Sequence, residues 1–263
     1  MLPLNKPHWA SLVYVAVCVL LMSAPAASAE TTLEKIKRTG VMTSANTFTY
    51  PPFGFIDNGR QIGLDVDLGN EIARRMGVKL KFENVDFRGI IAALTSGRVD
   101  TLITALTSTP EREKAILFSE PYFDGGIGGA YRVDNPITNA DDIIGKRVGM
   151  ELGAAGEFWT REKYGSRVQI KTYDTTFLAL KDLENGRLDA VVSSLPPMRY
   201  AMRTMPSIRV TKVWDSRVVG INTRHEDKDL MAEINQHLLA MKNDGTYDKL
   251  IAKWFGSPPE SGR

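Results

Sequence analysis

The sequence predicts an α/β fold made of two similar lobes. Segments with the apolar period of strands alternate with segments of helical period, and strand–helix–strand units of this length pair their strands in parallel. One unit also recurs, because residues 97–103 (GRVDTLI) and 186–192 (GRLDAVV) share a pattern 89 positions apart. Two related lobes explain this recurrence better than chance reuse of a common βαβ pattern, which is the alternative, since the chain is long enough for two domains.

The first 29 residues predict a cleaved signal peptide. Lys6 supplies a positive charge, residues 9–22 are apolar, and residues 27–29 (Ala-Ser-Ala) form a small-x-small cleavage site. The apolar run is too short for a convincing membrane span, and an uncleaved anchor is the alternative. Because Val17 before Cys18 is not the small residue that a lipoprotein signal requires, we expect an exported protein without a lipid anchor.

The first helix with a clear apolar stripe begins after Gly63 and ends at Gly77. Asp65 and Asp67 lie in its first turn, where the helix dipole favours negative charge. Its apolar side chains recur every four residues, at Leu64, Leu68, Ile72 and Met76.

The elements that follow repeat one arrangement in both halves of the chain. Apolar periodicity predicts strands over residues 78–82, 99–103, 146–150, 168–172 and 188–192, and helices over 87–96, 156–164 and 177–185. Open parallel sheets bind small molecules at the carboxyl ends of their strands. These ends are Thr104 and Ala105 in the first half, and Ser193 and Ser194 in the second.

The composition of the expected mature chain excludes several classes of function. Its 234 residues (263 minus 29) carry 32 Lys and Arg against 31 Asp and Glu, because the signal segment holds one Lys and no acid. This near-neutrality gives no electrostatic footprint for nucleic acid. Without Cys18 the chain has no thiol, and His225 and His237 are its only histidines. We therefore expect no disulfide, no metal site, no cofactor and no catalytic triad.

Residues 63–73, with the order G-L-D-V-D-L-x3-I-A, resemble the signature of the family 3 bacterial extracellular solute-binding proteins, the periplasmic receptors of polar-amino-acid ABC transporters. Other motifs of that family follow in its order over the whole mature chain. They are YPPF (50–53), DF (86–87), TxTPER (107–112), FSEPY (118–122), GKxVG (145–149), NDGTYDK (243–249) and KWFG (253–256).

The resemblance implies two Rossmann-like lobes joined by two crossing hinge strands, the type II periplasmic binding protein fold. The crossings are expected near residues 129–132 and 215–220. The first lobe would then hold residues 30–130 and 218–263, and the second lobe residues 131–217. The family also implies a monomeric periplasmic protein that captures a small carboxylate-bearing ligand and delivers it to the membrane permease of an ABC transporter.

Four residues of the first half match positions of the family's ligand site. Arg112 matches the arginine that pairs both oxygens of the ligand's carboxylate, for which a planar guanidinium is suited. Its charged neighbours in the sequence favour a surface arginine as the alternative. Thr107 matches the position whose backbone N–H assists the same carboxylate, and Thr104 and Ala105 match positions that line the site.

Two aromatic residues match the walls that enclose the ligand in this family. Tyr50 and Phe87 occupy these positions, and aromatic walls provide apolar contact at a low cost in conformational entropy. Ordinary core packing is the alternative for each.

The chain departs from the family at positions that help to bind the ligand's ammonium and carboxylate groups. Ser194 stands at the position of the aspartate that usually pairs with the α-ammonium, and Thr47 at that of an assisting acid. The Gly-[Ser/Thr]-Thr loop is here Gly153-Ala154-Ala155, so we expect its backbone N–H donors without its hydroxyls.

Glu151 is the candidate that compensates for the missing aspartate. An ammonium buried without a counter-charge costs several kcal/mol, and Glu151 falls at a ligand-adjacent position of the second lobe. A solvated residue at a strand end is the alternative for it. The ligand is then either an amino acid or derivative whose amine meets Glu151 or water, or an organic acid without a free amine. The chemistry of the site slightly favours the second, and the family favours the first.

Two other classes of function are weaker. The fold resembles that of periplasmic cyclohexadienyl dehydratases, in which a second-lobe glutamate is the general acid, and Glu157 lies near that position. Because this chain lacks the hydroxyl loop and the strand-end aspartate of those enzymes, we expect a binding protein. A sensory domain is the third class, but only a polar tail follows Gly256, so we expect a free-standing receptor.

Overall fold

The structure is a computed structural model that describes residues 29–256. The predicted signal peptide, apart from its last residue, and the polar tail from residue 257 lie outside the described residues. Within residues 29–256, no helix is both long and apolar enough to cross a membrane.

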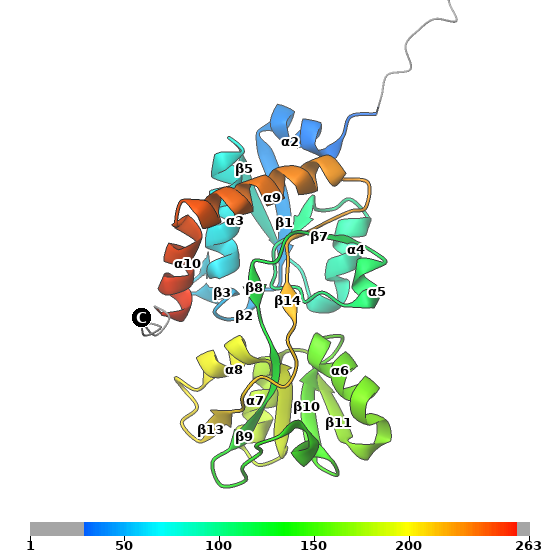
Figure 1. Cartoon of the computed structure of the whole chain (residues 1–263), viewed down its shortest axis with the longest axis vertical. Coiled ribbons are helices and arrows are strands. Elements are labelled where there is room, and N and C mark those ends of the chain that lie inside the picture. Colours follow the sequence, from blue (N-terminus) through cyan, green and yellow to red (C-terminus); the bar gives the residue numbers. More distant parts are fainter. Residues whose placement is uncertain (1–28, 257–263) are drawn as a thin grey trace, which may run out of the picture. The chain divides into compact units, whose positions relative to one another are not determined.

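Two five-stranded mixed sheets organise the described chain (Figure 1). We call the part built on the first sheet the first lobe and the part built on the second sheet the second lobe. In spatial order, the first sheet contains β5 (Lys79–Asn84), β1 (Val41–Asn46), β6 (Thr101–Leu102), β15 (Asn222–Thr223) and β7 (Leu117–Phe118). The second sheet contains β11 (Gln169–Tyr173), β10 (Arg147–Glu151), β12 (Ala190–Ser194), β9 (Ile127–Arg132) and β13 (Ile208–Val210).

The two sheets share one pairing pattern. In each, the second strand in the spatial order pairs in parallel with both neighbours, β1 with β5 and β6, and β10 with β11 and β12. The next strand in each sheet is antiparallel, β15 beside β6 and β9 beside β12. The two-lobe α/β fold that the sequence predicts is therefore confirmed.

Helices complete both lobes, and a small three-stranded meander belongs to the first. The first lobe contains α2 (Thr32–Thr39), α3 (Leu64–Arg75), η1 (Phe87–Gly89), α4 (Ile90–Thr95), α5 (Pro110–Glu113), α9 (Lys228–Asn243) and α10 (Thr246–Phe255), with a meander of β2 (Thr49–Tyr50), β3 (Gly54–Asp57) and β4 (Arg60–Ile62). The second lobe contains η2 (Ala140–Ile143), α6 (Ala155–Tyr164), η3 (Gly165–Arg167), α7 (Thr176–Glu184) and α8 (Leu195–Ala201).

The recurring Gly-Arg-apolar-Asp segment performs the same task in both lobes. Asp100 accepts a hydrogen bond from the backbone N–H of Thr43 at 2.9 Å, and Asp189 accepts one from the backbone N–H of Arg147 at 2.9 Å. In each case the aspartate ties the parallel strand that follows it to the neighbouring strand, β1 or β10. The repeat therefore reflects equivalent structure, which supports two related lobes over chance.

The stripe of α3 forms part of the first lobe's core. Leu64, Leu68 and Ile72 are fully buried, and burying each such side chain stabilises the fold by about 1.5–3 kcal/mol. The two acidic residues of the first turn make different contacts. Asp67 accepts hydrogen bonds from Lys253 and Trp254 of α10, while Asp65 is fully buried within the lobe. The favourable interaction with the helix dipole is therefore not the full reason for the acidic residue at either position.

The chain passes between the two sheets through a two-stranded antiparallel ladder. β8 (Phe123–Asp124) pairs with β14 (Val218–Val219) between the lobes (Figure 1). The expected second crossing, residues 215–220, contains β14. The expected first crossing, residues 129–132, is wrong, because these residues belong to β9 inside the second sheet. The lobe boundaries themselves stay a prediction, and the position of β9 favours an earlier first boundary.

Candidate ligand-binding site

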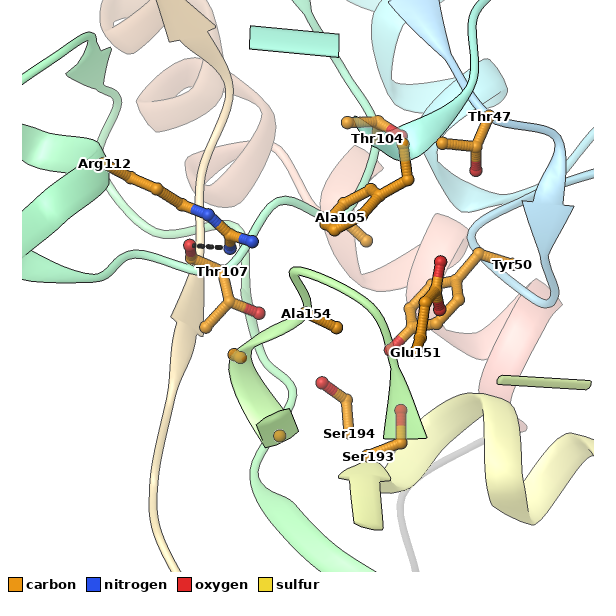
Figure 2. Close-up of a pocket in the computed structure, with 13 residues that line it drawn as sticks. Thr47, Tyr50, Thr104, Ala105, Thr107, Arg112, Glu151, Ala154, Ser193 and Ser194 are labelled. Atoms are coloured by element: carbon orange, nitrogen blue, oxygen red, sulfur yellow. Dashed lines mark hydrogen bonds between the residues drawn. The ribbon is translucent and has the colours of Figure 1, made fainter. Parts of the chain in front are cut away.

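A cavity of about 30 Å³ lies where the carboxyl ends of the parallel strands of both lobes face each other (Figure 2). This is the place that open parallel sheets use for ligands. It is lined by Thr47, Tyr50, Phe87, Thr104, Ala105, Thr107, Arg112, Glu151, Ala154, Ala155, Gly156, Ser193 and Ser194. All nine residues that the sequence nominated for the ligand are in this lining, and their role in binding stays a prediction.

Gly156 is the lining residue that the sequence analysis did not single out. It lies in the first turn of α6, where a Cβ atom would come within 2.8 Å of the carbonyl oxygen of Val192. The glycine lets the start of α6 approach β12 closely. A glycine in the first turn of a predicted helix is the signal that could have identified it.

Arg112 is held by the short helix α5. Thr109 caps this helix, accepting a hydrogen bond from the backbone N–H of Arg112 at 3.3 Å, and Pro110 occupies its first turn. The side chain is 7% exposed, and its guanidinium carbon lies 5.5 Å from the centre of the Phe87 ring. The charged neighbours in the sequence suggested a surface arginine, and the structure shows a buried one.

The guanidinium of Arg112 connects the two lobes. Its Nη1 donates to the carbonyl oxygen of Thr107 at 2.7 Å, and its Nη2 donates to the carbonyl oxygen of Gly153 in the second lobe at 2.8 Å. These bonds use two of the five guanidinium N–H donors. Burial lowers the pKa of Arg112 to about 10, against the attraction of Tyr50 and Glu151. The group therefore remains a cation at neutral pH.

The N-terminus of α6 forms another wall of the cavity. Its N-cap is Ala154, and the two residues after it, Ala155 and Gly156, also line the cavity. N–H groups in the first turn of a helix point out of its N-terminal end and carry partial positive charge. This wall therefore suits an anion, even though the loop has lost the hydroxyls found in the family.

Glu151 ends β10 and is buried, with 5% of its surface exposed. One of its oxygens, Oε2, accepts hydrogen bonds from the backbone N–H of Thr176 at 3.2 Å and from the Thr176 hydroxyl at 2.9 Å. Burial raises the pKa of Glu151 to about 7, against these bonds and the attraction of Arg112. The alternative of a solvated strand-end residue is therefore wrong.

Hydroxyl groups surround this glutamate. The hydroxyls of Thr176 and Ser193 lie 3.0 Å apart, and Ser194 is the N-cap residue of α8. Tyr50 points toward the same corner from the first lobe (Figure 2). Burial, followed by the nearby charge of Glu151, raises the pKa of the Tyr50 hydroxyl to about 12. The acid of the second lobe thus lies on β10, and β12 supplies hydroxyls.

Glu157 does not line the cavity, and its carboxylate forms hydrogen bonds elsewhere. It accepts a hydrogen bond from the backbone N–H of Gly153 at 2.6 Å and another from Nε of Arg161 at 2.8 Å. These bonds hold the loop that precedes α6. The geometry therefore gives Glu157 a structural task and does not support it as a general acid. Within residues 29–256, no cluster of three or more His, Cys, Asp or Glu side chains is arranged to hold a metal ion.

Known proteins match this chain over nearly all of its described length. Residues 42–257 match the bacterial extracellular solute-binding proteins, family 3. The L-cystine-binding protein TcyJ of Escherichia coli (strain K12) is 33% identical over 241 residues, which cover 90% of each chain. The ABC transporter arginine-binding protein 1 of the same organism is 33% identical over 214 residues, which cover 79% of this chain and 87% of that one.

Solved structures of similar proteins have the same fold. An ancestral arginine-binding protein bound to arginine has a TM-score of 0.79 and 37% identity, covering 82% of this chain and 99% of that chain. The ancestral amino acid-binding protein AncCDT-1, a precursor of cyclohexadienyl dehydratase, has a TM-score of 0.81 and 33% identity, covering 86% and 100%. These matches confirm the type II periplasmic binding protein fold and a binding protein in place of an enzyme. The chain belongs to the family 3 bacterial extracellular solute-binding proteins.

Proposed function

We propose that this protein is the periplasmic receptor of an amino-acid ABC importer, with the ligand's carboxylate on Arg112 and its ammonium or another cationic group on Glu151. The observation that carries the proposal is a buried guanidinium and a buried carboxyl group, one from each lobe, that line one cavity. Relatives named for cystine, arginine and lysine/arginine/ornithine binding support amino acids as the ligand class.

The carboxylate end of the cavity is built from both lobes. A carboxylate is a better acceptor for a guanidinium than a neutral carbonyl, so a ligand would compete with the carbonyl oxygens of Thr107 and Gly153 for Arg112. The N-terminus of α6, at Ala155 and Gly156, adds N–H donors from the second lobe. A bound carboxylate would thereby bridge the lobes.

Glu151, at the end of the cavity that would bind a cation, is the reason why we favour an amino acid over an organic acid without an amine. Glu151 would repel a purely anionic ligand, and its burial is costly unless a cation or a proton neutralises it. Thr176 bonds only Oε2 of Glu151, which leaves Oε1 for the ligand. Glu151 on β10 would thus replace the aspartate that the family usually places where Ser194 stands on β12.

Capture requires the lobes to separate. A cavity of about 30 Å³ has room for only a few water molecules, since one water needs about 10–15 Å³ of such space, so the walls must move to admit an amino acid. The β8–β14 ladder is the candidate hinge, because it is the paired connection between the two sheets. The proposal also includes export by a cleaved signal peptide, a monomeric receptor and delivery of the ligand to a membrane permease.

A thermal-shift screen of the mature protein against the common L-amino acids, L-cystine and simple organic acids tests this proposal. A ligand at 100 times its Kd raises the free energy of unfolding by about 2.7 kcal/mol, a readily detected shift. The best ligand is then compared with its N-acetyl derivative, which lacks the ammonium, and with its amide, which lacks the carboxylate. We expect the amide to abolish the shift and the N-acetyl derivative to reduce it.

Variants of Arg112 and Glu151 test the role of each side chain in ligand binding. Arg112→Ala should weaken binding more than 100-fold, whereas Arg74→Ala, at an exposed arginine paired with Glu71 on α3, should leave it unchanged. Glu151→Gln should weaken the free amino acid far more than its N-acetyl derivative. Unchanged binding by Arg112→Ala, or organic acids that outcompete every amino acid, would refute the proposal.

A further inference from the structure

Two segments that line the cavity contain residues in the left-handed backbone region without being glycine. Phe48 has φ of 50° and lies between the lining residues Thr47 and Tyr50, and Ala105, itself a lining residue, has φ of 48°. Residues with a Cβ atom adopt this conformation only at a steric cost. The surrounding structure must therefore hold both segments in place.

Each of these backbone positions is held by a buried polar side chain. The N–H of Phe48 donates to Oδ1 of Asn46 at 2.8 Å. The N–H of Ala105 donates to the hydroxyl of Tyr122 at 3.0 Å. Asn46 also donates through Nδ2 to the carbonyl oxygen of Ile103 at 2.6 Å, so it supports both segments.

Both side chains converge on Asp65. The Tyr122 hydroxyl donates to Asp65 Oδ1 at 2.7 Å, and Asn46 Nδ2 donates to Asp65 Oδ2 at 3.3 Å. Asp65, Asn46 and Tyr122 are at most 1% exposed. Burial raises the pKa of Asp65 to about 7, and these two bonds oppose that rise.

Burying a carboxyl group in a protein core without a neighbouring cation carries a large desolvation cost. In the part of the chain that the structure describes, no Lys, Arg or His forms an ion pair with Asp65. An apolar residue of similar size would avoid the cost of desolvation. The position is therefore poorly explained by stability alone, and its two hydrogen-bond partners indicate another task.

We propose that Asp65 is a positioning residue for the ligand site: through Asn46 and Tyr122 it holds the two left-handed segments at Phe48 and Ala105 in the conformation that binds ligand. Tyr122 orients the segment that leads from Ala105 toward Thr107, and Asn46 orients the segment that carries Tyr50. This inference rests on the proposed function, because the cavity must be the ligand site.

The first arm of the test needs no ligand. Amide hydrogen exchange is measured for the segments around Phe48 and Ala105. Tyr122→Phe should speed exchange mainly around Ala105, and Asp65→Asn should speed it around both segments. Tyr164→Phe is the matched control, because its hydroxyl donates to Asp141 at 2.8 Å in the second lobe, and it should affect neither. Unchanged exchange around Ala105 in Tyr122→Phe would overturn the inference.

The second arm measures affinity by calorimetry with L-arginine, L-cystine and L-histidine as probes. Tyr122→Phe should weaken binding of the tightest probe at least tenfold. Adding Ala105→Gly should recover most of that loss, because glycine adopts positive φ without the steric cost. A purely structural hydroxyl would instead lower Tm without changing Kd, as expected for Tyr164→Phe, and that result for Tyr122→Phe would overturn the inference.

The two proposals fail in different ways. If the wild-type protein binds no amino acid, the proposed function fails, and so does the assignment of Asp65 to a ligand site. If the wild-type protein binds and Tyr122→Phe leaves either exchange or affinity unchanged, only the positioning role fails. Should Asp65→Asn not fold, Tyr122→Phe with its Ala105→Gly partner still decides the question.

Discussion

Replacing Glu151 by glutamine is expected to remove a pH dependence from the stability of this protein. Burial places the pKa of Glu151 at about 7 in the folded state, compared with 4.5 as its ordinary value. Glutamine has nearly the same shape and can still accept the two hydrogen bonds from Thr176 through its carbonyl oxygen. The variant therefore removes the charge with little change in packing.

The sign and size of the effect follow from proton linkage. Between pH 4.5 and 7 the folded state keeps a proton on Glu151 that the unfolded state has released, so the free energy of unfolding falls as pH rises. A difference of about 2.5 pKa units corresponds to about 3 kcal/mol, and the full penalty is present above pH 7. Asp65, whose pKa is also raised to about 7, is present in both proteins, so it cancels in their difference.

Urea unfolding of the two proteins from pH 4.5 to 8 measures this difference. Tryptophan fluorescence and circular dichroism are followed together, since coincident transitions justify a two-state treatment. The free energy of unfolding of Glu151→Gln relative to wild type should rise by about 3 kcal/mol up to pH 7 and then remain level. A difference that stays constant within about 0.5 kcal/mol would show that the Glu151 carboxyl is hydrated, and would refute the reasoning.

The same titration predicts how ligand binding depends on pH. A cationic ligand group beside Glu151 favours the ionised carboxylate. Affinity for an amino acid should therefore increase as pH rises through 7, with release of a proton on binding. In Glu151→Gln this part of the pH dependence should disappear, and calorimetry in buffers of different ionisation enthalpy measures the proton release directly.

Gly63→Ala should lower the free energy of unfolding by more than about 2 kcal/mol in urea, because Gly63 has φ of 135° and a Cβ atom there would lie 2.0 Å from the carbonyl oxygen of Phe53; unaltered stability would contradict this. Arg88→Ala should change ligand affinity less than about fivefold, because the ion pair of Arg88 with Asp174 across the lobes is 61% and 73% exposed and exposed pairs contribute about 1 kcal/mol or less. A loss of 50-fold in calorimetry would show that this pair controls closure.

Local sequence determined most of the element order. The four-residue stripe of α3 and the alternation of β5 depend on neighbouring residues alone, so periodicity is sufficient to predict them. The Gly-Arg-apolar-Asp repeat also indicated two related lobes, because Asp100 and Asp189 perform the same hydrogen bonding in both. The ligand role of Arg112 came from the resemblance to a family, since its charged neighbours favour a surface position.

Tertiary structure decided the features that depend on distant segments. The sequence places a crossing near residues 129–132, but the pairing of β9 with β12, more than 60 positions away, makes these residues part of the second sheet. Asp65 and Asp67 are equivalent in a helix pattern, but only Asp65 meets Tyr122 and Asn46. Position in the sequence left open whether Glu151 is solvated or buried. In the structure it is buried and accepts a hydrogen bond from Thr176, 25 positions later. Periodicity identifies which residues form an element, whereas burial and charge environment are set by the segments that pack against it.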